Sequence, residues 1–153
     1  MIWTCPRCDR SFGRANRPHE CAPGMPIEVW LDERTEPQRR AAEAVLAIVR
    51  RHRDLIVEAV GVGILIKRER TIVELRPKQR WLDLAFLTGA AIASRRIART
   101  IALANGTYYA VHLVDERDVD AELRGWLSAA LARTSRPASP RRAPGRQRRT
   151  RTR

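Results

Sequence analysis

The stretch 71-TIVELRPKQRWLDLAFLT-88 decides the fold class of this 153-residue chain. Apolar residues alternate with polar ones over 71–77 and again over 80–88. A period of two, with many β-branched residues, is typical of half-buried strands. The short break at Lys78-Gln79 predicts that the two strands pair as an antiparallel hairpin.

Further strands are expected on both sides of this hairpin. The segment IVEAVGVGILIK, residues 56–67, reads as one strand or as two interrupted near its glycines. The segments 96–103 and 107–114 are expected to form a second hairpin. Its turn contains Asn105-Gly106, which supplies the positive φ angles that a tight turn needs.

Helical periodicity precedes and follows the strands. Thr35, followed three residues later by Gln38, fits a capping box, with Pro37 in the first turn. The apolar face of this first helix comprises Ala41, Val45, Ile48, Val49 and His52. The stripe of the last helix, which Asp115 or Asp118 can cap, comprises Val119, Leu123, Trp126, Leu127, Ala130 and Leu131. The order predicts an α+β domain: a helix, four or five mainly antiparallel strands, and a helix, with the helices on one face of the sheet.

The N-terminal stretch 3-WTCPRCDRSFGRANRPHEC-21 holds all three cysteines of the chain and one of its three histidines. Cys5, Cys8, His19 and Cys21 follow the pattern Cys-x2-Cys-x10-His-x-Cys, which offers four thiolate and imidazole ligands of the kind that zinc prefers. Residues near the pair Cys5 and Cys8 are mostly polar, so a segment this short needs a cross-link to fold. One structural zinc ion is therefore predicted. A redox dithiol and inert thiols are the alternatives.

Charge divides the chain unevenly. Residues 134–153 contain eight Arg and no acid, whereas residues 1–133 contain 22 basic and 17 acidic residues. We expect three segments: a Cys/His finger over 1–25, an α+β body over 26–133 and a disordered Arg-rich tail over 134–153.

No apolar run approaches the roughly 20 residues that span a bilayer, and no secretory signal is visible, so a cytoplasmic location is expected.

The segments WTCPRCDRSF, NRPHEC, GVGILIKRERTIVELRPKQRWLDLAF, RRIARTI and VHLVDERDVDAELRGWLSAAL resemble a group of bacterial proteins. These pair an N-terminal Cys/His finger with the domain-of-unknown-function family numbered 5655. The resemblance covers most of residues 3–133 and omits the tail. It implies a small α+β domain with no established activity, and it transfers only the presumed metal ligands onto this chain. Relatives beside nuclease-like modules add a hint towards nucleic acid.

Arginine supplies the strongest functional signal outside the finger. Arginines that neutralise the phosphates of DNA or RNA release the counterions condensed on the nucleic acid, which favours binding. A nucleic-acid-binding protein without enzymatic activity is therefore the leading hypothesis, with DNA or RNA as partner. The expected contacts are Arg7, Arg10, Arg14 and Arg17 in the finger and Arg141, Arg142, Arg148 and Arg149 in the tail. Trp3 and Phe12 are expected to pack around the metal or against the body. A module that binds an acidic protein is the alternative.

An enzymatic or small-molecule site is a third alternative. It would use carboxylates that alternate with apolar strand residues, together with one histidine: Glu58, Glu74, Asp83 and His112. The same alternation is typical of solvent-facing strand positions, balanced by Lys67, Arg76 or Arg80 in cross-strand ion pairs. No nucleophile stands at a readable spacing from a base, so no catalytic residue is predicted.

Overall fold

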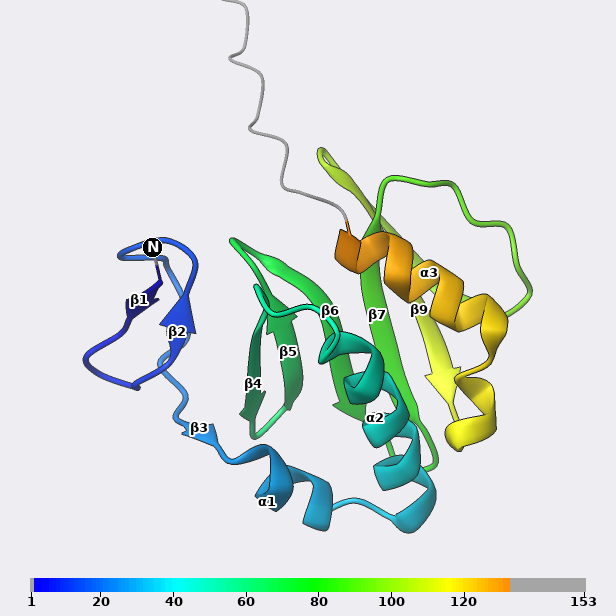
Figure 1. Cartoon of the computed structure of the whole chain (residues 1–153), viewed down its shortest axis with the longest axis horizontal. Helices are drawn as coiled ribbons and strands as arrows, with labels where there is room; N and C mark the ends of the chain where they lie inside the picture. Colours follow the sequence, from blue (N-terminus) through cyan, green and yellow to red (C-terminus); the bar gives the residue numbers. More distant parts are fainter. Residues whose placement is uncertain (1, 133–153) are drawn as a thin grey trace, which may run out of the picture.

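The computed structural model describes residues 2–132. A two-stranded hairpin and a seven-stranded antiparallel sheet share this part of the chain with three α-helices and one 3-10 turn (Figure 1). The elements in chain order are β1 (Trp3–Thr4), β2 (Ser11–Phe12), β3 (Gly24–Met25), α1 (Ile27–Asp32), α2 (Glu36–Val49), β4 (Ile56–Val60), β5 (Gly63–Lys67), β6 (Thr71–Pro77), β7 (Leu82–Thr88), β8 (Ile97–Leu103), β9 (Gly106–Leu113), η1 (Glu116–Asp118) and α3 (Ala121–Ala132). The prediction of a disordered tail over 134–153 lies outside the described residues.

The α+β class and the antiparallel sheet are confirmed, but the predicted number of four or five strands is wrong. The large sheet has seven strands in the order β3-β4-β5-β6-β7-β9-β8. The segment 56–67 divides into β4 and β5, which pair from Val60 and Gly63 outward. Gly24 and Met25, at the end of the predicted finger, add β3, a strand of two residues paired with β4.

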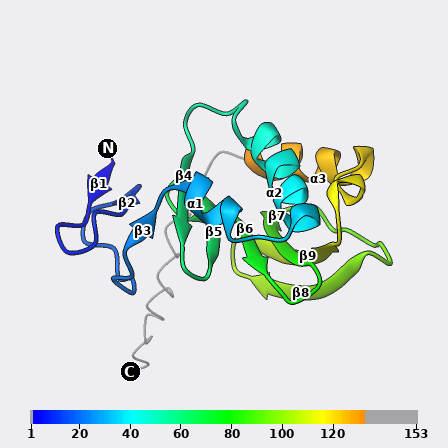
Figure 2. The same ribbon diagram turned by 90° about the horizontal axis from the view of Figure 1, so that it is seen from below.

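Helices α2 and α3 lie side by side over one face of the sheet (Figures 1 and 2). Their apolar faces, with the short α1, bury the inward side chains of the central strands. The largest fully buried side chains are Trp30, Leu46, Ile64, Ile66, Leu75, Leu82, Leu84, Phe86, Leu113, Leu123, Leu127 and Leu131. No helix of the described part is long and apolar enough to cross a membrane.

Helix capping follows the sequence in part. The Thr35 hydroxyl accepts a hydrogen bond from the backbone N–H of Gln38 at 3.4 Å, as predicted. The Gln38 side chain instead donates to the carbonyl oxygens of Lys78 (2.7 Å) and Trp81 (3.2 Å), which ties α2 to the β6–β7 turn. At α3 the Asp120 carboxylate accepts from the Leu123 N–H at 3.0 Å.

Neither of the two aspartates expected to cap the last helix does so. Asp115 and Asp118 form a capping box around the preceding η1 instead. That 3-10 turn leads the chain from β9 into α3, so α3 begins later than the sequence suggested.

Gly63 begins β5 where the backbone of β6 approaches closely. A Cβ atom at this position would lie 2.1 Å from the backbone oxygen of Leu75, a distance that real Cβ contacts do not show. At Gly61, in the preceding turn, a Cβ atom would meet nothing within 4 Å. Position 61 therefore tolerates a side chain, whereas position 63 does not.

We expect Gly63→Ala to lower the free energy of unfolding by at least about 2 kcal/mol, because strands β5 and β6 must separate to admit the methyl group. The matched variant Gly61→Ala should change it by less than about 0.5 kcal/mol. Urea denaturation of both variants followed by circular dichroism measures the difference. Equal stability of the two variants would contradict the close approach.

Candidate metal centre

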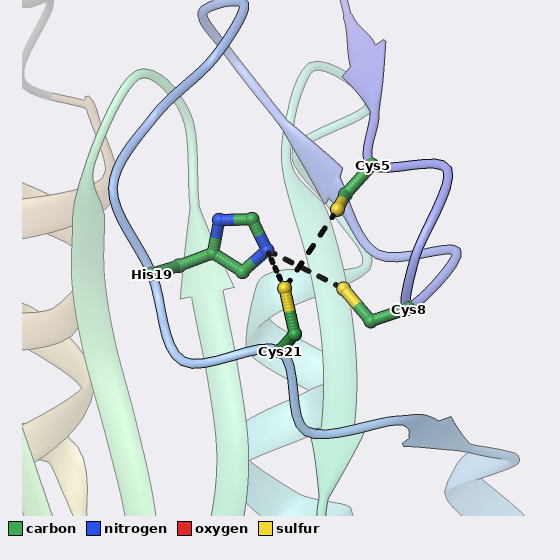
Figure 3. A group of neighbouring side chains, drawn as sticks. All are labelled: Cys5, Cys8, His19 and Cys21. Atoms are coloured by element: carbon green, nitrogen blue, oxygen red, sulfur yellow. Dashed lines mark hydrogen bonds between the residues drawn. The ribbon is translucent and has the colours of Figure 1, made fainter.

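The four residues singled out by the sequence come together in the structure. The ligand atoms of Cys5, Cys8, His19 and Cys21 all lie within 4.8 Å of one another (Figure 3). The Nε2 atom of His19 lies 3.4 Å from each of the Cys8 and Cys21 sulfurs, and the Cys5 and Cys21 sulfurs are 4.0 Å apart. This group can hold a metal ion.

Local backbone geometry aims the ligands at one point. Strands β1 and β2 pair Trp3 with Phe12, and between them the chain turns tightly. Two backbone hydrogen bonds of 2.9 Å, from Asp9 N–H to the Cys5 oxygen and from Cys5 N–H to the Arg10 oxygen, close this turn. Asp9 adopts a positive φ of 54°, which turns the chain back after Cys8.

The imidazole of His19 is oriented by its other nitrogen. Nδ1 lies 2.7 Å from the backbone oxygen of Arg17, to which it can donate. That bond selects the tautomer whose Nε2 lone pair faces the sulfurs, as metal-ligating histidines usually require.

The thiols differ in their readiness to ionise. The backbone N–H of Arg7 is the main cause that lowers the pKa of Cys5 to about 7, with a further contribution from the Cys8 N–H. Desolvation raises the pKa of Cys21, and the charges of Cys5 and Cys8 add to the rise. A cation at the centre of the group would instead favour ionisation of all three thiols, because it attracts each thiolate.

Aromatic rings enclose the group, as expected for Trp3 and Phe12. The Phe12 ring, 4% exposed, lies 4.2 Å from the His19 ring between centroids, and the Trp3 ring meets His19 edge-on at 6.2 Å. Together with the buried Cys5 and Cys8 they form a small apolar cluster separate from the main core. The small interior of the finger is thus made mainly of two ligand sulfurs and two aromatic rings, with the His19 ring packed against them.

Glu58 on β4 fastens the finger to the sheet. Its carboxylate accepts a hydrogen bond from the Ser11 N–H (2.7 Å), pairs with Arg10 Nε (3.1 Å) and pairs with Lys67 Nζ (2.6 Å). The side chain is only 12% exposed, and the sequence had placed this residue in solvent. That expectation was wrong, because the finger covers this part of the sheet.

The same three partners determine the ionisation of Glu58. Burial by itself raises the pKa of a carboxyl group, but Lys67, the Ser11 N–H and Arg10 together hold the pKa of Glu58 below its ordinary value. Burial also lowers the pKa of Lys67, while Glu58 opposes that shift. The Lys67 ammonium also lies 3.9 Å from the centroid of the Phe12 ring. The same cation therefore contacts both Glu58 of the sheet and an aromatic ring of the finger.

A second contact joins the finger to the β5–β6 turn. A Cβ atom at Gly13 would lie 2.5 Å from the backbone oxygen of Arg68, so the finger backbone lies directly against that turn. Arg17 donates to the backbone oxygen of Glu69 at 3.1 Å.

The expected nucleic-acid contacts occupy different environments. Arg7 and Arg14 are exposed, and Arg17 is half-buried against the β5–β6 turn. Arg10 is 8% exposed and bonded to Glu58 and to the Glu20 backbone oxygen, so we drop it from the set of phosphate contacts. Arg141, Arg142, Arg148 and Arg149 lie outside the described residues.

The carboxylates and histidine of the third alternative do not form one cleft. A cavity of about 510 Å³ between finger and body reaches Glu58 but not Glu74, Asp83 or His112. Lys67 on β5 pairs with Glu58 on β4, as the predicted cross-strand ion pairs required, whereas Glu74 pairs with Arg76 of its own strand, β6, at 3.1 Å. Asp83 is 7% exposed rather than solvent-facing, because Trp81 and His112 lie against it.

Replacement of Glu58 by glutamine should lower the free energy of unfolding of the metal-loaded protein by about 2–4 kcal/mol, because two buried cations lose their counter-charge. Glu69→Gln, which removes an exposed carboxylate from the neighbouring turn, is the control and should cost less than about 0.5 kcal/mol. Urea denaturation measures both. If the two variants unfold alike, Glu58 does not fasten the finger.

Comparisons of the chain with protein-family models, curated proteins and solved structures found no match. The resemblance to family 5655 therefore stays a prediction, and function must be inferred from the geometry of the chain itself.

Proposed function

We propose that the chain is a zinc protein whose ion has a structural role. The convergence of three thiols and one imidazole carries this proposal. Ideal zinc bond lengths place tetrahedral ligands roughly 3.8 Å apart between sulfurs and roughly 3.6 Å apart between sulfur and nitrogen. The observed separations of 4.0 Å and 3.4 Å agree with that polyhedron.

Completeness of the ligand set supports a structural ion over a catalytic one. Four protein ligands fill a tetrahedron, whereas a catalytic zinc keeps one position for water or substrate. Cys5 and Cys8 are buried and two aromatic rings adjoin the ligands. The thiols are free rather than disulfide-bonded, which suits a reducing compartment such as the cytoplasm.

The 153-residue chain should contain one zinc ion and keep it during incubation with a competing chelator. His19→Gln should lose the ion to the chelator, because a tetrahedral site loses its only imidazole. His52→Gln, which replaces a histidine away from the site, should keep it. Elemental analysis of the three proteins gives the readout, and equal retention by both variants would refute the ligand assignment.

Nucleic-acid binding is the function that we propose for this zinc protein. Two exposed arginines of the finger, Arg7 and Arg14, and the eight arginines of residues 134–153 support it. Such a concentration of guanidinium groups binds phosphates with strong dependence on salt and little dependence on sequence.

The salt dependence of binding tests this proposal. In the full chain, replacement of Arg141, Arg142, Arg148 and Arg149 by glutamine should reduce the slope of log K against log salt by about 3, since each phosphate contact contributes about 0.7 to 0.9. Fluorescence anisotropy with a labelled 12-nucleotide strand and its duplex measures the slope. A wild-type protein that binds neither probe at physiological salt would end the proposal.

A module that binds an acidic protein remains the second candidate. Strand β8 lies at the edge of the sheet and has no further strand beside it among the described residues. It exposes Arg99 (55%) and Ile101 (46%), which suits strand addition by a peptide with carboxylate and apolar side chains. Recovery of one stoichiometric protein without nucleic acid would favour this candidate.

A further inference from the structure

One face of the sheet has no helix over it within residues 2–132. Helices α2 and α3 cover the opposite face, and Figure 2 shows the sheet with the helices on one side only. Side chains alternate along each strand, so Leu84, Phe86 and Val111 point to the helices while their neighbours Asp83 and His112 belong to the other face. We call this second side, over β6, β7, β9 and β8, the open face.

A stacked pair of rings lies on the open face. The Trp81 and His112 rings have centroids 4.5 Å apart and are inclined by 26°. Asp83 holds both, because its Oδ1 accepts from Trp81 Nε1 at 3.1 Å and lies 3.3 Å from His112 Nε2. The His112 side chain remains 45% exposed, so the stack is fixed in place and reachable from solvent.

Two arginines border this stack. Arg76 on β6 lies in the same cross-strand row as Asp83 on β7 and His112 on β9. Arg99 on β8 reaches from the other side to within 3.8 Å of Asp83. The rings therefore lie between guanidinium groups from strands on both sides.

The charge at the surface of the open face is positive although the face contains acids. The side chains of Arg76 and Arg99 are 49% and 55% exposed, whereas those of their partners Glu74 and Asp83 are 27% and 9% exposed. The carboxylates lie beneath the arginines and fix their positions. A polyanion that approaches this face meets guanidinium groups first.

We propose that the open face binds single-stranded nucleic acid. The Trp81–His112 stack receives one base, and Arg76 and Arg99 contact the neighbouring phosphates. The inference rests on the proposed nucleic-acid binding but assigns it a surface of the folded body, distinct from the arginines of finger and tail.

The rings favour a single strand over a duplex. Bases of a duplex are stacked on one another and do not offer their faces, whereas an unpaired base can stack on an aromatic side chain. An acidic protein segment would be attracted by the arginines but would gain nothing specific from the stack. The combination of rings and flanking cations is typical of surfaces that bind single strands.

The experiment uses the full chain with a fluorescein-labelled 12-nucleotide oligothymidylate and the same strand in a duplex, followed by anisotropy. His112→Ala should weaken single-strand binding roughly tenfold and duplex binding less than about twofold, because one stacking contact is lost. His112→Phe, which keeps a ring, should bind the single strand within about twofold of the wild type.

A charge variant provides an independent measurement. The double substitution Arg76→Gln and Arg99→Gln should weaken single-strand binding and reduce its salt slope by about 1.4, two contacts at 0.7 each. Its matched control is Arg50→Gln with Arg51→Gln, which removes two exposed arginines at the end of α2 and should leave binding unchanged. Thermal melts of all variants establish that each is folded.

The outcomes separate this inference from the proposed function. If the open-face variants bind like the wild type while glutamines in the tail weaken binding, the open face is not the site and the proposed function stands. If the wild type binds neither probe, both fall. Selective loss of single-strand binding in His112→Ala and in the Arg76/Arg99 variant supports the inference.

Discussion

The arrangement of the molecule depends on one carboxylate held out of water. Glu58 is ionised under the finger because Ser11, Arg10 and Lys67 surround it with an N–H group and two cations. Each member of this group would be costly to bury alone, so finger and sheet exclude water from it only together. Lys67 also meets the face of Phe12, which in turn contacts the ring of His19. Packing thus continues from a strand of the body to His19, one of the four residues that could hold a metal ion.

A finger of this size has no other means of staying folded. Its interior contains the sulfurs of Cys5 and Cys8 and two aromatic rings, and these bury too little apolar surface to offset the entropy of ordering the chain. The attachment to β4 supplies part of what the finger lacks, and a metal ion held by the four proposed ligands would supply the rest. Because Arg10 serves this attachment, the finger has fewer arginines for a partner than its composition suggests.

The features of this structure that depend on near neighbours in the sequence were predictable. The Cys-x2-Cys pair, the Thr35 cap and the alternation over residues 71–88 are patterns that depend on near neighbours, and each is found where the sequence placed it. The seven-strand order was not predictable, because β9 pairs with β7 through contacts distant in sequence and leaves β8 outside. Strand β3 has two residues, too few to show any period. The burial of Glu58 and Asp83 depends on what covers them, which alternation along a strand does not reveal.

The two edge strands of the large sheet, β3 and β8, differ in a way that limits how copies of the chain can assemble. At one end, the two-residue β3 lies between Pro23 and Pro26, which have no N–H to donate to a further strand. At the other end, β8 offers seven residues of backbone. A sheet that grows into a filament needs both of its edges, since every added copy must present a new one. Strand β8 is therefore the better edge for a further strand, and pairing of two copies through β8 is favoured over growth of a filament that would also have to use the short β3.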